Sequence, residues 1–246
     1  VERSRGLGDV YKRQDACYKS SSKAVHLAKK HGSKLHVLHL TTEKEMELFE
    51  SGDHQKRITA EVCVHHLYFN DSSYEDLGSL VVCNPAVKKI SDQEALINAL
   101  KNDRIDIFAT DHAPHTKEEK ERPYPNCPSG LPLVQHSLLA LMEMQREYQI
   151  SIETIVKKTS HAVADIYGIK ERGYIREGYW ADLVMVDPNG QHQVTSENIM
   201  YECGWSPFEG HCFQSSIDMT FVNGIKVFEK GQILTKPKGI RLEFHH

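Results

Sequence analysis

The segment DIFATDHAPHTKEEK, residues 106–120, joins a short apolar run to a cluster of chemically active side chains. Asp106–Thr110 is predicted to be a buried strand. Asp111 ends it, and His112 and His115 follow at once. A carboxylate at a strand end can bind a divalent metal, accept a proton from metal-bound water, or do both. It can equally cap the turn that follows the strand, and the segment alone does not separate these interpretations.

Upstream of this segment, short apolar strands alternate with helical stretches. Lys34–Leu40 (KLHVLHL) and Ile58–Leu67 (ITAEVCVHHL) are predicted strands. The predicted helices are residues 15–31, a segment opening at a Thr42–Glu45 capping box, and a segment opening at a Ser91–Glu94 capping box. This alternation predicts βαβ units and a parallel sheet. A (β/α)₈ barrel and an open doubly wound sheet would both place a ligand at the carboxyl ends of the strands.

The rest of the chain predicts a long loop, two helices and a β-rich end. Residues 115–130 form a proline-containing loop, and residues 131–148 and 151–167 are the predicted helices. Short β segments follow, with a hairpin signal at Asn223-Gly224. We therefore expect an α/β region over residues 15–170 and a small β module over 171–246. Residues 1–14 lack an amphipathic period and are expected to be a non-native or disordered tail.

Composition excludes several functional classes. The 246 residues carry a net charge of −4 with the two signs well mixed, so no nucleic-acid partner is expected. No run of eighteen apolar residues occurs, so no membrane span is expected. The six cysteines form no CxxC pair, and in a chain of this size they indicate reduced thiols and a cytoplasmic location.

Histidines close two of the predicted strands. Strand periodicity puts His36 and His39 on opposite faces, and His39 lies nearer the carboxyl end, where a ligand belongs. His39 and Asp111, at the ends of different strands, therefore form a candidate metal pair. One of His65 and His66 must face inward, either supporting the site or forming an ordinary polar strand end.

Several segments together resemble the dihydroorotases, and most closely the type I enzymes of the amidohydrolase superfamily. TDHAPH, with Lys117 or Lys120 shortly after it, resembles the second signature of that family. Further segments that resemble it are LHVLHLTT, ITAEVCVHHL, CNPAVK, NCPSGLPLVQHSLLAL, GYWADLVMVD and CGWSPFEG. The resemblance runs from about Asp15 to near the end of the sequence.

The resemblance implies a fold, a reaction and a set of site residues. The fold would be a (β/α)₈ barrel of the TIM type with a small C-terminal β module. The reaction would be the reversible, zinc-dependent hydrolysis of dihydroorotate to N-carbamoyl-L-aspartate. Asp111 would be the catalytic acid–base and a ligand of one of two zinc ions, and His39 a ligand of the other. The substrate would be bound by Asn84, His115, Ser129 and Gly130. Whether the enzyme is a homodimer stays open.

Other family motifs are absent from this sequence. These are the HxH pair of the first strand, the arginine after it, the bridging carboxylated lysine and the histidine of strand five. We therefore expect strands six to eight of the barrel only, and an incomplete, inactive chain. Two alternatives stay open: a non-catalytic dihydroorotase-like scaffold protein, and a cyclic amidase of the hydantoinase or allantoinase kind. His115 favours dihydroorotase over the latter.

Overall fold

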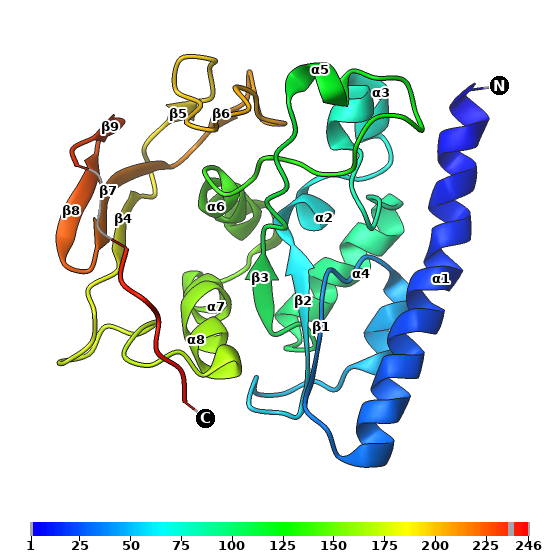
Figure 1. Ribbon diagram of the computed structural model, residues 1–246, viewed down its shortest axis with the longest axis horizontal. Coiled ribbons are helices and arrows are strands. Elements are labelled where there is room, and N and C mark those ends of the chain that lie inside the picture. The colour runs from blue at the N-terminus through cyan, green and yellow to red at the C-terminus, as the bar shows by residue number, and fades with distance from the viewer. Residues whose placement is uncertain (1, 236–238, 246) are drawn as a thin grey trace. The chain divides into compact units, whose positions relative to one another are not determined.

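The computed structural model describes residues 2–235 and 239–245 (Figure 1). The chain divides into two compact units. The first runs to Ser137 and takes in Ile199–Pro207, and the second contains Leu138–Asn198 and the chain from Phe208 onward. This division lies earlier in the sequence than residue 170, where we placed the end of the α/β region; that domain boundary stays a prediction.

The first unit is built on three parallel strands, as the alternating pattern predicted. They are β1 (Leu35–Val37), β2 (Ile58–Cys63) and β3 (Ile107–Ala109), in the order β1-β2-β3. The central strand β2 is buried from Thr59 to Cys63, which is typical of a parallel strand covered on both faces. Helix α4 (Ile90–Lys101) lies on the connection from β2 to β3 (Figure 1). All three carboxyl ends therefore meet at one edge of the sheet.

Two predicted strands end earlier than expected. β1 stops at Val37, and β2 gives way after Cys63 to helix α2 (Val64–Tyr68). The prediction that His65 and His66 close a strand is therefore wrong. Residues 64–67 lie in a short helical turn, and all four are buried. A helical turn can bury four consecutive residues when the chain packs around it on every side.

The predictions about helices in the first unit are confirmed in part. The remaining helices are α1 (Glu2–His31), the 3₁₀ helix η1 (Glu43–Leu48), α3 (Ser73–Leu77), the 3₁₀ helix η2 (Gly78–Val81) and α5 (Lys117–Lys120). The Thr42 cap is confirmed, because its hydroxyl accepts from the Glu45 N–H. The cap at Ser91 is wrong, because α4 begins at Ile90 after Lys89. The backbone of residues 2–14 forms the first part of α1. The expectation that residues 1–14 are a non-native or disordered tail stays a prediction.

The second unit pairs helices with an antiparallel sheet. Its helical segments are α6 (Ser137–Tyr148), α7 (Ile152–Val156), the π-helical η3 (Lys157–His161) and α8 (Ala162–Tyr167). The four-stranded sheet has the order β4-β7-β8-β9, from Leu183–Asp187, Ser216–Val222, Ile225–Glu229 and Gln232–Ile233. A two-stranded sheet joins β5 (His192–Gln193) to β6 (Cys212–Phe213). The predicted hairpin joins β7 to β8, with positive φ at Asn223 and Gly224, as a type I′ turn requires.

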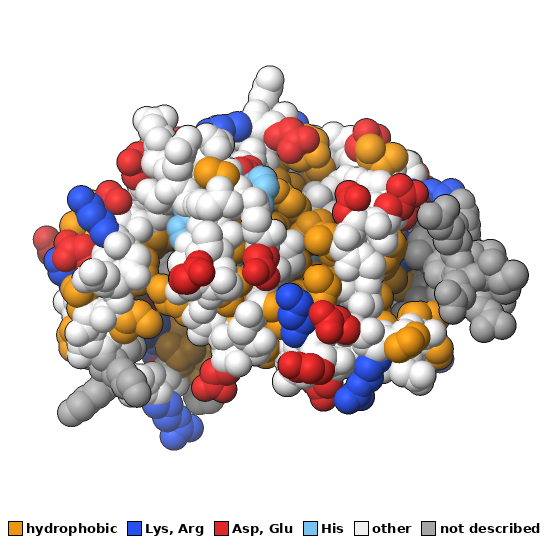
Figure 2. All heavy atoms as spheres, turned by 90° about the horizontal axis from the view of Figure 1, so that it is seen from above, with side chains coloured by type: hydrophobic (Ala, Val, Ile, Leu, Met, Phe, Trp, Pro, Cys, Tyr) orange, Lys and Arg blue, Asp and Glu red, His pale blue; other side chains and the backbone are white. Residues whose placement is uncertain are grey.

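The surface mixes the two signs of charge. On the face in Figure 2, acidic and basic side chains are interspersed with hydrophobic ones. Within the part of the chain that the structure describes, no helix is both long enough and apolar enough to cross a bilayer.

Candidate active site

His39 and Asp111 meet at the carboxyl edge of the parallel sheet. His39 lies two residues beyond β1 and Asp111 two residues beyond β3. Both adopt left-handed backbone conformations, with φ of 55° and 45°. His39 Nε2 lies 3.7 Å from Asp111 Oδ1. The structure thus brings together the two residues that the sequence proposed as metal ligands.

Glu61, on β2, fixes the orientation of His39. Its Oε1 lies 2.8 Å from His39 Nδ1, and its Oε2 lies 3.1 Å from His36 Nε2. The prediction that His36 and His39 point to opposite faces is therefore wrong. The positive φ at His39 ends the strand and turns its ring back toward Glu61, so period-two alternation no longer applies at that residue.

The same contacts set the charge states. Burial opposes the ionisation of Glu61, but hydrogen bonds from His36 and His39 outweigh it and lower the Glu61 pKa to about 2. The hydrogen bond to Glu61 raises the pKa of His39 against the effect of burial, and Asp111 adds to the rise. The edge of the sheet is therefore a place where positive charge is favoured.

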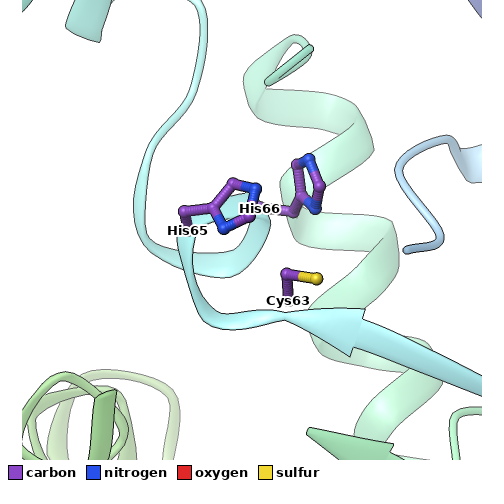
Figure 3. Close-up of side chains that lie close together, drawn as sticks. All are labelled: Cys63, His65 and His66. Atoms are coloured by element: carbon purple, nitrogen blue, oxygen red, sulfur yellow. The ribbon is translucent and has the colours of Figure 1, made fainter. Parts of the chain in front are cut away.

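Cys63, His65 and His66 form a second, fully buried group beside this pair (Figure 3). Burial raises the pKa of the Cys63 thiol, whose Sγ lies 3.0 Å from His39 Nδ1. Burial lowers the pKa of His65 to about 3 and that of His66 well below its usual value. His66 Nε2 also contacts the Pro85 carbonyl at 2.8 Å. These groups are neutral near pH 7 and pack behind His39.

The predicted substrate residues after β3 also lie together. His115 Nε2 is 3.2 Å from the Ser129 carbonyl oxygen. The Gly130 N–H donates to the Val82 carbonyl at 3.0 Å. A Cβ at Gly130 would lie 2.5 Å from the Ala113 carbonyl oxygen, and the residue has φ of 141°, so this close approach requires glycine.

Asn84 is exposed and lies two residues after Val82, on the segment that Gly130 contacts. Asn84 therefore belongs to the segment whose backbone contacts the loop at Val82. Among the described residues, no hydrogen bond or ion pair joins its side chain to His39 or Asp111. His112 has a different role from the one proposed for Asp111 or His115. Its Nδ1 accepts from the backbone N–H groups of Leu133 and Val134, so it supports the chain after the loop.

Sequence analysis did not single out Glu61 or Trp205, and it named Lys120 only as one of two lysines that follow the TDHAPH segment. Glu61 was read only as part of a strand, yet its position in the middle of β2 is an unusual place for a carboxylate and could have marked it. Lys120 is fully buried within a charged run, KEEK, which looks exposed. Trp205 donates through Nε1 to the His115 carbonyl at 2.7 Å. That contact spans too much sequence for any local pattern to indicate.

The donor set at the sheet edge fits zinc. Imidazole nitrogen and carboxylate oxygen are both zinc ligands. Glu61 engages Nδ1 of His39, which leaves Nε2 facing Asp111, and a carboxylate on the second ring nitrogen is the usual support of a metal-bound histidine. Cys63 is a weaker candidate, because its buried thiol would have to lose its proton.

The chain that carries this fold and these strand-end residues matches a known protein family. The model of the amidohydrolase family matches residues 12–227, so the chain belongs to this family. Its α/β fold is accordingly of the TIM-barrel type.

The curated relatives give a narrower comparison, because they are named dihydroorotases. That of Halobacterium salinarum is 32% identical over 89% of this chain and 51% of its own length. That of Pyrococcus horikoshii is 33% identical over 89% and 51%. The chain thus spans about half the length of the curated relatives it matches.

Solved structures of hydantoinases share the fold. The L-hydantoinase of Arthrobacter aurescens has a TM-score of 0.82 at 24% identity, over 89% of this chain and 50% of that one. A D-hydantoinase has a TM-score of 0.78 at 22% identity, over 88% and 50%. At this identity the likeness concerns the fold.

Proposed function

We propose that the intact protein containing this chain is a cytoplasmic dihydroorotase. It would catalyse the reversible hydrolysis of dihydroorotate to N-carbamoyl-L-aspartate in pyrimidine biosynthesis. The observation that carries the proposal is the approach of His39 Nε2 to Asp111 Oδ1, 3.7 Å apart, at the edge where the His115 loop begins. The curated relatives named dihydroorotase support the choice of substrate.

Asp111 would be the catalytic acid–base. Its carboxylate would take a proton from the attacking water and deliver it to the ring nitrogen as the amide bond breaks. Its left-handed backbone, with φ of 45°, projects the side chain from the end of β3 beside His39. Bound zinc would lower the pKa of water and polarise the carbonyl of the substrate. His39 and Asp111 would each hold one of two zinc ions.

The loop after Asp111 would bind the substrate. His115 would hydrogen-bond the carboxylate of dihydroorotate, and Asn84 would orient the ring. Ser129 and Gly130 would contact the ring through backbone groups. The contact of His115 Nε2 with the Ser129 carbonyl supports a common site for these residues. Positioning of the substrate would be their main contribution to the rate.

β1, β2 and β3 would correspond to strands six to eight of the family barrel. Each zinc would then take one ligand from this chain. Its other ligands would come from the part of the intact protein that corresponds to the unmatched half of the relatives. A structural or catalytic zinc needs three or four ligands. We therefore propose that the 246-residue chain alone is inactive.

The test is a comparison of two proteins, each supplied with zinc. We expect the full-length protein to hydrolyse dihydroorotate and the 246-residue chain to show no turnover. Failure of the full-length protein to act on dihydroorotate would refute the proposed activity. Turnover by the 246-residue chain would refute the proposed division of the zinc ligands.

A second candidate activity is that of a hydantoinase-like cyclic amidase, because solved structures of similar fold include hydantoinases. Turnover of hydantoin in preference to dihydroorotate would favour it. His115, at the position proposed to bind the substrate carboxylate, argues against it, because hydantoin has no carboxylate. A non-catalytic scaffold would bind zinc weakly and hydrolyse neither compound.

A further inference from the structure

We infer that Lys120 is a positioning residue, which fastens together the two segments that carry the substrate-binding groups. The inference rests on the proposed function and extends it to a residue that does not touch the substrate. It would act through Asn84 on one segment and through Ser129 and Gly130 on the other.

The first observation is the complete burial of Lys120. It is the last residue of the short helix α5, and its relative exposure is 0%. Its Nζ donates to the Val82 carbonyl at 2.8 Å and to the Pro128 carbonyl at 3.0 Å. Within the described residues no carboxylate pairs with it. Burial of an ammonium without a counter-ion is costly. The two hydrogen bonds to backbone carbonyls are what offset that cost.

The second observation is where the two acceptors lie. Val82 is two residues before Asn84, and Pro128 immediately precedes Ser129. The carbonyl of Val82 also accepts from the N–H of Gly130. One ammonium and one amide therefore converge on a single carbonyl oxygen, and together they set the spacing of the two segments.

The third observation is that the lysine itself is held firmly. Helix α5 opens with a capping box between Thr116 and Glu119. Glu119 Oε2 also lies 3.8 Å from His115 Nδ1, and Trp205 holds the His115 carbonyl. The helix that presents Lys120 is thus tied to the same loop that presents His115. Charge-assisted hydrogen bonds from a fixed ammonium are the stronger kind, which suits a fastening role.

The experiment compares Lys120→Met with Lys117→Met in the full-length protein with zinc. Methionine keeps the unbranched apolar stem of lysine, is one atom shorter, and removes the hydrogen-bond donors. Lys117 is on the same helix but exposed, so it is the matched control. We expect Lys120→Met to raise KM for dihydroorotate by at least about tenfold, with kcat changed less than about threefold and zinc content unchanged. Lys117→Met should match the parent protein.

A role limited to stability would not move KM, because the folded fraction would bind substrate normally. An unchanged KM in folded Lys120→Met would therefore overturn the inference, as would loss of zinc as the main effect. If Lys120→Met does not fold, Lys120→Gln, which keeps one amide donor on a shorter side chain, takes its place with the same expected rise in KM.

Deuterium uptake at the Gly130 amide separates this inference from the proposed function. We expect faster uptake there in Lys120→Met than in Lys117→Met, whatever the substrate is. If the parent protein does not act on dihydroorotate but Lys120→Met still takes up deuterium faster than Lys117→Met, the proposed activity is refuted and the fastening of the two segments stands. Equal uptake in both variants would overturn the fastening itself.

Discussion

The side chains of His39 and Asp111 face each other across the carboxyl edge of the sheet, with Nε2 and Oδ1 3.7 Å apart. They lie just beyond the ends of the two outer strands, β1 and β3, and β2 between these strands supplies Glu61. All three strands of the first unit therefore contribute to one place.

Replacement of Asp111 by asparagine should abolish acid–base catalysis. Asparagine keeps the size and tolerates the left-handed backbone, but it cannot carry the proton. We expect kcat/KM for dihydroorotate in the full-length protein to fall by about 10² to 10⁴. The far-UV circular dichroism spectrum and the Tm should stay close to those of the parent. A rate near the parent value would remove Asp111 from the acid–base role.

Replacement of His115 by alanine should weaken substrate binding. His115 contacts the Ser129 carbonyl and lies outside the His39–Asp111 pair. We expect KM for dihydroorotate to rise by about ten- to a hundredfold, with zinc content unchanged. His31→Ala, on the exposed end of α1, is the control. A drop in bound zinc would show that His115 had been assigned the wrong role.

Replacement of Glu61 by glutamine should loosen the metal site. Glutamine keeps the shape but loses the charge that holds His39 Nδ1 and His36 Nε2. We expect zinc affinity to fall by about ten- to a hundredfold, measured by competition with a chelator. Glu47→Gln, at an exposed position, should leave affinity unchanged. Equal affinities in the two variants would contradict a supporting role for Glu61.

Acid should destabilise the fold through His65. Its folded pKa of about 3 lies below the ordinary 6.5. Below pH 6.5 the unfolded chain binds a proton that the folded chain refuses, so the free energy of unfolding falls as pH falls toward 3. The slope from this histidine is up to about 1.4 kcal/mol per pH unit.

Urea titrations of the full-length protein between pH 6.5 and 5.5 measure that slope. His65→Asn should be less stable at pH 7, because it leaves a cavity, yet its stability should depend less on pH. His31→Asn should keep the parent slope. A parent-like slope in His65→Asn would show that His65 is not a source of the acid sensitivity.

The sequence predicted the parts of the site that depend on strand ends. Apolar runs followed by His39 or Asp111 are local signals, and parallel strands bring their carboxyl ends together whatever the details. The prediction of which way the side chains point failed at His39 itself. Period-two alternation separates His36 from His39, but it assumes extended backbone, and the left-handed φ at His39 breaks that assumption.

The supporting contacts could not be predicted from the sequence, because they depend on packing between distant segments. Lys120 sits in a run of charges that is usually solvated, and only the folded loop shows that its ammonium is buried. His65 and His66 looked like alternating strand residues. They form a buried helical turn instead, because the chain around them covers every side.

The left-handed backbone at His39 and Asp111 lowers the stability of the fold at the two positions where the proposed activity requires these side chains. A non-glycine residue in that region carries strain of about 1 kcal/mol or more, and glycine at either position would relieve it while removing the chemistry. Mutants ranked by heat resistance alone would then favour the loss of these two side chains. Directed evolution of the proposed dihydroorotase for hotter conditions would need an activity screen at every round.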